Sequence, residues 1–200
     1  MTYEICKRLF DFFFSLLFLL ILLPFFILIS LAIILTSGFP VFYSQQRVGK
    51  NFRTFSMLKF RTMKTGSDQS GLLTVGNDSR ITSVGKFLRR WKLDELPQLV
   101  NVVIGHMSFV GPRPEVPKYV SLYNEQQKKT LLVRPGLTDP ASLHFFNENK
   151  ILGSYENPEE AYIKEIMLRK LEMYADYIRK RNFLMDMKII LATIGRIFSS

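Results

Sequence analysis

The feature that most constrains this chain is a run of 24 residues without a charge, from Phe12 to Leu35. Only Ser15, Pro24 and Ser30 interrupt its apolar side chains. A helix needs about 20 apolar residues to span the hydrocarbon core of a membrane, so the run is long enough. A signal peptide has a shorter apolar core of about 7–15 residues, followed by small residues at its cleavage site. The N-terminal segment is therefore predicted to lie in a membrane.

Both flanks of the apolar run are positively charged. Lys7 and Arg8 precede it, and six Lys or Arg residues follow it between positions 47 and 64. Basic residues favour the cytoplasmic side of a membrane, so the two flanks compete for the same side. Pro24 lies at the centre of the run, and a proline inside a helix removes a backbone hydrogen bond and kinks the helix. The residues alone predict either a re-entrant helix–break–helix, which enters and leaves at the cytoplasmic face, or a kinked spanning helix.

The remaining sequence, residues 39–200, is predicted to form one cytosolic, membrane-associated domain behind the membrane segment at 1–38. Positions 38–93 hold eleven Lys or Arg against two acidic residues, and the whole chain has a net charge of +10. Such a charge favours an anionic partner: a membrane surface, a nucleic acid or a phosphorylated small molecule. Cys6 is the single cysteine, which excludes an intrachain disulfide and a zinc site built from thiolates.

Local patterns predict an α+β domain that is mostly helical. Strand-like segments at 41–43 and 52–58 come first. A small β-hairpin is predicted over 72–75 and 80–82, around a Gly-Asn-Asp-Ser turn. A short amphipathic helix is predicted over 84–91.

The C-terminal part is predicted to form amphipathic helices. Apolar side chains recur at helical spacing over 163–178 and again over 183–198. Such a stripe either packs in a core or lies in the headgroup layer of a membrane. Because the second stripe stays apolar to the end of the sequence, it is predicted to be interfacial.

An acidic pair, Asp94 and Glu95, marks the most informative segment. Apolar residues at helical spacing run from Leu96 to Ile104, and Gly105 favours a helix end there. Proline is tolerated in the first turn of a helix, so Pro97 predicts a start near Asp94. For an isolated pair of this kind, the ordinary interpretation is that Asp94 is an N-cap.

The surroundings of the acidic pair favour a chemical role. Arg113 lies between two prolines in a stiff loop, Arg134 precedes a Pro-Gly turn, and Lys59 and Arg61 share a face if their segment is extended. Carboxylates beside several cations favour chemistry on a phosphorylated substrate with a divalent cation, because hard cations bind carboxylate and phosphate oxygens.

Five motifs in order make the chain similar to the bacterial sugar transferases, the polyprenol-phosphate phosphoglycosyl transferases. The similarity covers nearly the whole chain and resembles the small monotopic members most. The motifs are Gln46-Arg47-Val48-Gly49, Lys59-Phe60-Arg61-Thr62-Met63, Asp94-Glu95-Leu96-Pro97-Gln98, Gly111-Pro112-Arg113-Pro114 and Arg134-Pro135-Gly136-Leu137-Thr138.

The resemblance implies an activity and a location. Such enzymes move a sugar-1-phosphate from a UDP-sugar to a polyprenyl (undecaprenyl) phosphate, release UMP and so begin glycan assembly on the membrane. The implied partners are the UDP-sugar, the polyprenyl phosphate and the lipids of the bacterial inner membrane, with the catalytic domain on the cytoplasmic face and no nucleic acid. The family's re-entrant helix also favours the hairpin interpretation of the N-terminal run.

The resemblance also implies residue roles. Asp94 matches the family nucleophile, which forms a phosphosugar–aspartyl intermediate and binds Mg²⁺, and Glu95 is implied to handle protons or activate the acceptor. The basic positions are implied to bind the diphosphate; they are Lys59, Arg61, Arg113 and Arg134. Physically, phosphoryl transfer depends on positioning and charge neutralisation, and a carboxylate nucleophile divides the transfer into two steps.

Two positions depart from the family pattern. Leu23 precedes the membrane proline where the family has Ser, whose side chain can bond backbone groups that the break leaves unpaired. Phe146 occupies a position where the family has Arg, so a phosphate or nucleotide contact is either missing or supplied by Lys150.

Two other function classes fit parts of the sequence. A membrane-tethered polybasic module that binds anionic lipid without catalysis would need no metal and would tolerate Asp94→Asn. A nucleic-acid binder fits the basic segment at 38–93, but the segment lacks the interleaved aromatic residues of single-strand binders, and a membrane anchor disfavours this class.

Overall fold

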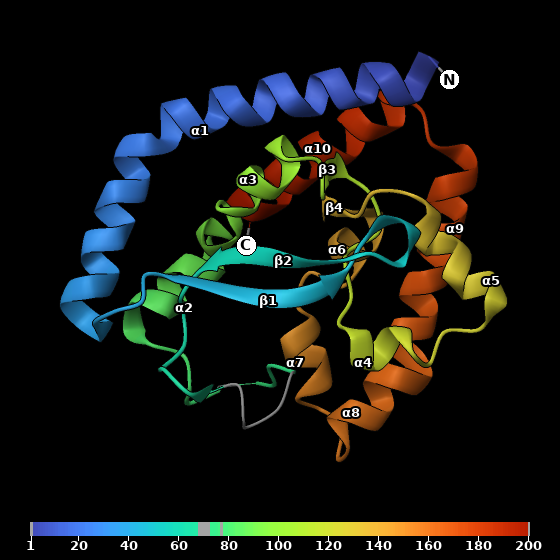
Figure 1. Cartoon of the computed structure of the whole chain (residues 1–200). Coiled ribbons are helices and arrows are strands. Elements are labelled where there is room, and N and C mark those ends of the chain that lie inside the picture. Colours follow the sequence, from blue (N-terminus) through green and yellow to red (C-terminus); the bar gives the residue numbers. More distant parts are fainter. Residues whose placement is uncertain (1, 68–72, 77, 200) are drawn as a thin grey trace.

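The computed structural model describes residues 2–67, 73–76 and 78–199. The fold is mostly helical, with a long bent N-terminal helix lying along one side of a body that contains two small sheets (Figure 1). The α-helices are α1 (Thr2–Ser37), α2 (Ser83–Arg90), α3 (Gln98–Val103), α4 (Pro117–Val120), α5 (Glu125–Lys128), α6 (Pro140–His144), α7 (Glu148–Leu152), α8 (Pro158–Ala161), α9 (Met167–Lys180) and α10 (Phe183–Phe198). The strands are β1 (Phe42–Val48), β2 (Thr54–Phe60), β3 (Ser108–Val110) and β4 (Gly136–Thr138), and the shorter helical turns are η1 (Lys50–Phe52), η3 (Leu93–Glu95), η4 (Lys129–Leu132) and the π-helical η5 (Tyr162–Ile166).

The apolar run forms one helix, α1, with Pro24 inside it. Tyr3–Ser37 is long and apolar enough to cross a membrane. Figure 1 shows two arms that meet at a bend in the middle of this helix. The residues predicted either a helix–break–helix, which the family resemblance favoured, or a kinked helix, and in the structure the helix continues through the bend. A proline removes only one backbone donor, so the remaining ladder can continue around it.

Both arms of α1 lie against the same body. In the first arm, Lys7 forms an ion pair of 2.6 Å with Asp186 of α10, and Asp11 accepts a hydrogen bond from the backbone of Phe109 at 3.0 Å. In the second arm, Ile33 is buried beside Phe60 of β2. The two ends of the apolar helix are thereby held to one compact unit. Most of the apolar side chains between the ends remain exposed, which is the surface a lipid phase covers.

The small β-hairpin of this fold is formed by β1 and β2. These strands pair antiparallel, with Phe42 opposite Phe60 and Val48 opposite Thr54. The hairpin predicted over 72–82 is not the one observed. Leu72 and Asn77 lie outside the described residues, and in the described part Ile81 forms an isolated bridge with Met63 instead.

Two of the sequence motifs form loops that lie side by side. The parallel strands β3 and β4 pair Ser108 with Gly136 and Val110 with Thr138. Backbone hydrogen bonds continue the contact, from Gly111 N to Thr138 O and from Gly136 N to Pro112 O. A Cβ at Gly136 would lie 2.2 Å from the Gly111 nitrogen, so this close approach requires glycine.

The C-terminal helices have different environments. Helix α9 buries Met167, Leu171 and Tyr174 in the main apolar core, so its stripe packs in the protein. Helix α10 buries Asp186 and Ile189 but leaves other apolar side chains exposed, with Leu184 at 73%. The exposed face of α10 is the part for which an interfacial position remains a prediction.

Candidate active site

The acidic pair lies in a short turn ahead of α3. Leu93–Glu95 form the 3-10 turn η3, and α3 begins only at Gln98. The sequence predicted a single helix starting near Asp94. Leu96 and Pro97 have right-handed helical backbone angles, but the bonds here are of the tighter i to i−3 kind, from Leu96 N to Leu93 O and from Leu99 N to Leu96 O. Neither η3 nor α3 has a side-chain N-cap bond, so capping does not account for Asp94.

Asp94 is a buried carboxylate with an unpaired oxygen. The residue is 6% exposed, and its Oδ1 atom is buried without a hydrogen-bond partner. Burial raises the pKa of Asp94, and the nearby Lys59 opposes this rise. A buried polar atom without a partner is costly, so this oxygen is available to a ligand.

Glu95 has the opposite environment. It accepts a hydrogen bond from Lys59 Nζ at 2.9 Å, and both Nη atoms of Arg113 contact its two carboxylate oxygens. Burial alone would raise the pKa of Glu95, but Arg113 and Lys59 together hold it well below its usual range. The structure therefore brings Lys59 and Arg113 together with the acidic pair, as the sequence analysis expected.

The structure does not bring Arg61 to this site. Arg61 is 6% exposed, and its guanidinium donates to the backbone oxygens of Ser37, Gly38 and Phe39 at 2.6–2.8 Å. These carbonyls end α1 and begin the following turn, where a cation complements the helix dipole. Arg61 thus ties the membrane helix to β2, although the sequence motif predicted a phosphate contact.

Arg134 also lies away from the acidic pair. Its Nε donates to the backbone oxygen of Gly105 at 3.0 Å, while Arg8 of α1 donates to the carbonyls of Val102 and Val103. The two guanidinium groups bind the carboxyl end of α3 and the turn after it. Arg134 does not line the cleft over the acidic pair, so its predicted phosphate contact stays a prediction.

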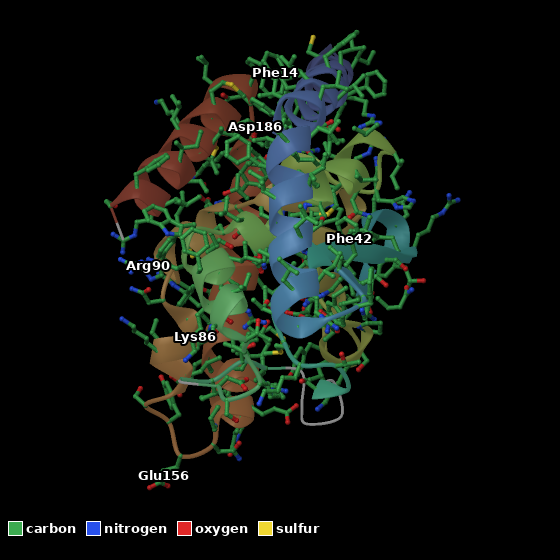
Figure 2. The ribbon with its side chains drawn as sticks, turned by 90° about the vertical axis from the view of Figure 1, so that its left-hand side faces the viewer. Phe14, Phe42, Lys86, Arg90, Glu156 and Asp186 are labelled. Atoms are coloured by element: carbon green, nitrogen blue, oxygen red, sulfur yellow. The ribbon has the colours of Figure 1, made fainter. Side chains whose placement is uncertain are left out.

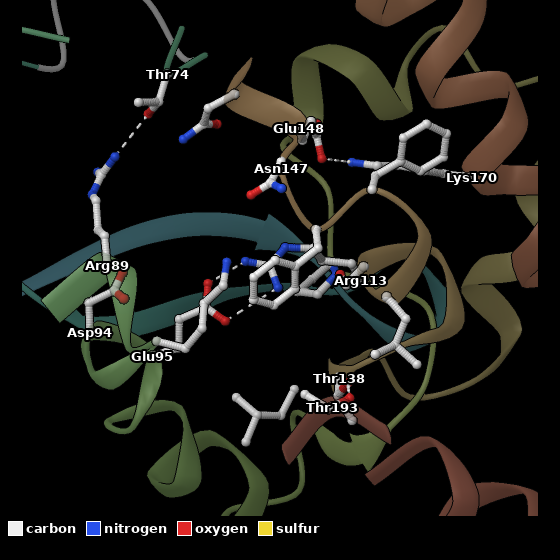
Figure 3. Close-up of a pocket in the computed structure, with 18 of the residues that line it drawn as sticks. Thr74, Arg89, Asp94, Glu95, Arg113, Thr138, Asn147, Glu148, Lys170 and Thr193 are labelled. Carbon is white, nitrogen blue, oxygen red and sulfur yellow. Dashed lines mark hydrogen bonds and ion pairs between the residues drawn. The ribbon is translucent and has the colours of Figure 1, made fainter. Parts of the chain in front are cut away.

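A cleft of about 1340 Å³ opens over the acidic pair. Figure 3 shows Asp94 and Glu95 on one side of it and Asn147, Glu148 and Lys170 across it. One wall is apolar, with residues from α1, α3, α10 and the segments beside them, and the opposite wall is polar. The apolar wall includes Phe18, Leu22, Leu96, Leu99, Ile190, Ile194 and Ile197, and the polar wall includes Thr74, Arg89, Asn147, Asn149, Lys150 and Lys170.

Several residues of the cleft were not predicted. Arg89 of α2 donates to Thr62 and Thr74, and its charge acts on Asp94. Helical spacing placed Arg89 on α2 but could not show which way α2 faces.

Asp139, to which the sequence assigned no role, is the N-cap of α6 through Ser142.

Phe146 lines the cleft where the family pattern has Arg. Lys92 and Arg196 lie near its ring, at 5.4 Å and 5.2 Å from the centroid. Lys150 lines the cleft as well. Cations are thus present around this position, although the residue at 146 is aromatic.

The described residues contain no group of three or more His, Cys, Asp or Glu side chains that could hold a metal ion. Glu95 is already paired with two cations, so Asp94 is the carboxylate of the pair with an available oxygen. Any divalent cation here would need oxygens from a bound substrate in addition to Asp94.

A long apolar helix bent onto a body with a basic cleft and a buried carboxylate is the arrangement of a membrane-associated enzyme that acts on an anionic substrate. Comparison with known proteins identifies the family of the chain. Residues 2–200 match the family described as "Bacterial sugar transferase", and the chain belongs to this family. It is a sugar transferase.

Two relatives match over most of both chains. The chain is 39% identical over 199 residues to the "Exopolysaccharide production protein PSS" of Rhizobium leguminosarum bv. phaseoli, covering 95% of this chain and 94% of the relative. It is 36% identical over 197 residues to the "Uncharacterized sugar transferase EpsL" of Bacillus subtilis (strain 168), covering 98% and 89%.

A third relative carries an activity in its name. The chain is 34% identical over 199 residues to the "UDP-glucose:undecaprenyl-phosphate glucose-1-phosphate transferase" of Escherichia coli (strain K12). The match covers 98% of this chain and only 40% of that protein. The shared part contains the acidic pair and the cleft.

Proposed function

We propose that this enzyme transfers a sugar-1-phosphate from a UDP-sugar to a polyprenyl phosphate such as undecaprenyl phosphate, through a covalent intermediate on Asp94. The reaction releases UMP and forms a polyprenyl diphosphosugar, the first membrane-bound product of glycan assembly. The observation that carries the proposal is the buried, unpaired Asp94 oxygen in a cleft lined with cations. The names of the relatives support the substrate classes.

In the first step, an Asp94 oxygen attacks the phosphorus that bears the sugar. The bond from this phosphorus to the bridging oxygen of the diphosphate breaks, and UMP leaves with the electron pair. Asp94 becomes an acyl phosphate that carries the sugar. Burial leaves the carboxylate poorly solvated, and its raised pKa makes it a better nucleophile than an exposed Asp.

The cations of the cleft neutralise the diphosphate. Lys59 and Arg113 lie beside Glu95, and Arg89 acts on Asp94 from the polar wall. A magnesium ion fits the available donors, since Mg²⁺ is commonly held by one or two carboxylates and substrate phosphates. Asp94 would hold it, and it would supply charge neutralisation at the transferring phosphoryl group.

In the second step, an oxygen of the polyprenyl phosphate attacks the phosphorus of the acyl phosphate. The bond to Asp94 breaks, and the carboxylate is regenerated as the lipid diphosphate forms. A phosphomonoester with a second pKa near 6 is already largely ionised at neutral pH, so this step needs no strong general base. We therefore assign Glu95 the task of holding Lys59 and Arg113 in place, because a carboxylate with so low a pKa is a weak proton acceptor.

The two walls of the cleft accommodate the two substrates. The apolar wall, built partly by α1 and α10, suits a polyprenyl chain that enters from a membrane, and the polar wall suits the UDP-sugar. Both ends of α1 are held on the same body, and this supports a re-entrant helix at the cytoplasmic face of the inner membrane. The exposed apolar face of α10 then lies in the headgroup layer.

A UMP-release assay tests the proposal. The full chain in detergent is supplied with polyprenyl phosphate, Mg²⁺ and one UDP-sugar at a time. UMP release with at least one UDP-sugar, dependent on the lipid and abolished by chelation, is the expected result. Lipid binding without UMP release from any UDP-sugar would instead favour a non-catalytic module that binds anionic lipid.

A further inference from the structure

Two cations from distant parts of the chain meet at one aromatic ring beside the apolar wall. Phe146 lies between α6 and α7 and is half-buried. Lys92 Nζ comes from the turn before η3, and the guanidinium of Arg196 comes from the last turns of α10. In the described part of the chain, neither cation forms an ion pair with a carboxylate.

The two cations differ in their surroundings: the charge of Lys92 also acts on the nearby Asp94 and Glu95, whereas Arg196 is an exposed cation at the ring. An aromatic face attracts a cation by about 0.5–1 kcal/mol at an exposed site, which holds the group in place without neutralising it. Lys92 also adopts a left-handed backbone conformation, with φ of 56°, which is uncommon for a residue with a side chain. An uncommon backbone conformation beside two cations that share one ring is typical of a ligand site.

The last turns of α10 are fixed at this point by independent contacts. Thr193 and Thr138 form a hydrogen bond of 2.5 Å, and the rings of Phe198 and Trp91 are 6.4 Å apart. Arg196 is exposed, and its position beside the cleft is fixed by its helix as well as by the ring of Phe146, which lines the cleft.

The cleft residues next to Arg196 in the sequence are apolar. Ile194 and Ile197 line the cleft on either side of Arg196 in the sequence, and the apolar wall continues from them to Phe18 of α1. A ligand that places an anionic group near Phe146 can thus extend along a hydrocarbon surface. A nucleoside diphosphate lacks such a tail, whereas a polyprenyl phosphate has one.

From this geometry we infer that Lys92 and Arg196 bind the phosphomonoester of the acceptor lipid, and that Phe146 is the positioning residue that holds them there. This inference rests on the proposed function, in which a polyprenyl phosphate is the acceptor. Arg196 and Phe146 are not part of the Lys59–Arg113–Glu95 group, to which the proposed function assigns the diphosphate of the donor, and Lys92 lies between the two, since its charge also acts on Glu95.

Steady-state kinetics in non-ionic detergent micelles test the inference, with lipid and nucleotide concentrations varied independently. In Arg196→Ala, the KM for polyprenyl phosphate is expected to rise about tenfold, the change for one lost charge-assisted contact. The KM for the UDP-sugar and the exchange of labelled UMP into UDP-sugar without lipid should not change. Lys188→Ala is the matched control, because Lys188 is an exposed cation on the same helix, whereas it is Arg196 that lies 5.2 Å from the centroid of the Phe146 ring.

Phe146 is tested by the same measurements. Phe146→Leu is expected to raise the KM for the lipid phosphate about threefold, in line with a cation–π contact, while kcat is retained. Phe146→Tyr keeps an aromatic face, so its KM for the lipid phosphate should equal that of the unmodified protein. A purely structural role for the ring would lower kcat and the exchange rate together.

Three results would contradict the inference. The first is that Arg196→Ala leaves the KM for the lipid unchanged, as Lys188→Ala should. The second is that Arg196→Ala raises the KM values for the UDP-sugar and the lipid equally. The third is that Phe146→Tyr raises the KM for the lipid as much as Phe146→Leu does. Equilibrium binding of labelled polyprenyl phosphate provides a readout that needs no turnover. Loss of this binding in Arg196→Ala supports the site even if no UDP-sugar is consumed, whereas absence of UMP exchange in the unmodified protein contradicts the proposed function alone.

Discussion

At the scale of single residues, Asp94 and Glu95 are neighbours in the sequence with opposite electrostatic environments. Asp94 has a buried oxygen without a partner, and Glu95 is bound by two cations. Burial pushes the pKa of Asp94 up, while Arg113 and Lys59 overcome burial and push the pKa of Glu95 down. Such divergence between paired carboxylates is how one site assigns them different tasks.

Glu95→Gln tests the task assigned to Glu95. The substitution preserves shape but leaves Lys59 and Arg113 without their carboxylate, and we expect it to lower the free energy of unfolding by about 3 kcal/mol. Because the pKa of Glu95 is depressed in the folded protein, its contribution is fully present above the unfolded pKa of about 4.3. That contribution is lost as the pH falls through the lower folded value.

Denaturant unfolding of both proteins between pH 7 and pH 3 checks this expectation. The stability difference should be largest near neutral pH and should shrink in acid. A difference that is independent of pH would show that the ionised form of Glu95 is not what holds the two cations.

Arg61→Lys tests the structural role of Arg61. Lysine keeps the charge but cannot bind three carbonyls from one planar group, so the contact with the end of α1 is weakened. We expect a lower thermal unfolding temperature with an unchanged KM for the UDP-sugar. A rise in the KM for the UDP-sugar without a change in the unfolding temperature would instead support the phosphate contact that the motif predicted.

Residue types alone separated some of these roles and not others. The resemblance to the sugar transferases grouped Lys59 and Arg113 with the acidic pair, and the structure brings both to Glu95. Arg61 and Arg134 occur in equally distinct motifs, yet their side chains bind backbone carbonyls. Motif spacing gives no side-chain direction, and an Arg at a helix end satisfies carbonyls as readily as it binds a phosphate.

At the scale of elements, the loops that carry Gly111 and Gly136 fix the position of Arg113. We expect Gly136→Ala to lower the free energy of unfolding by about 3 kcal/mol, because its Cβ would contact the backbone of Gly111 and Thr138 at 2.2–2.5 Å. Activity should fall as well, since Arg113 follows directly in the displaced loop.

Gly195→Ala is the control for this substitution. Gly195 lies within α10, and a Cβ there has nothing within 4 Å. This change should leave stability equal or slightly higher, by about 1 kcal/mol or less. Thermal unfolding in detergent compares the two variants, and equal behaviour would contradict the packing argument.

The membrane helix allows a test of topology through its own cysteine. Cys6 is exposed on the first arm of α1. If α1 is re-entrant, an impermeant thiol reagent that reaches only the outer face of the inner membrane should not label Cys6, and inverted vesicles should label it. Labelling from the outer face would contradict the hairpin.

Pro24→Leu should move part of the population toward labelling from the outer face. Without the proline, α1 can straighten, and its 24-residue uncharged run would extend about 36 Å, enough to cross a hydrocarbon core. Unchanged labelling in this variant would show that contacts such as Lys7–Asp186, and not Pro24, determine the topology.

Element prediction succeeded where the pattern was local. The apolar run, the short helix at 83–90 and the C-terminal helices follow from periodicity. The pairing of β1 with β2 could not be predicted in this way. Val41-Phe42-Tyr43 is strand-like, but the partner of this strand and its register depend on contacts between different parts of the sequence. Figure 2 shows Phe42 of β1 and Lys86 of α2 on either side of the second arm of α1, an arrangement that only the folded chain defines.

At the scale of the whole molecule, the cleft joins an apolar wall to a charged one. Helices α1 and α10 come from opposite ends of the chain and meet through Lys7 and Asp186. The sequence predicted both as membrane-facing segments but could not predict that they share one cavity with the acidic pair. Under the proposed function, the apolar wall receives the lipid acceptor and the polar wall receives the nucleotide donor.

The most direct test of this account is the exchange of labelled UMP into UDP-sugar in the absence of any lipid. A covalent Asp94 intermediate makes the first step reversible on its own, so the unmodified protein should catalyse exchange, and Asp94→Asn should abolish both exchange and turnover while remaining folded. Direct attack by the polyprenyl phosphate needs both substrates together. Absence of exchange in an enzyme that turns over with lipid, or normal exchange by a folded Asp94→Asn variant, would contradict the account.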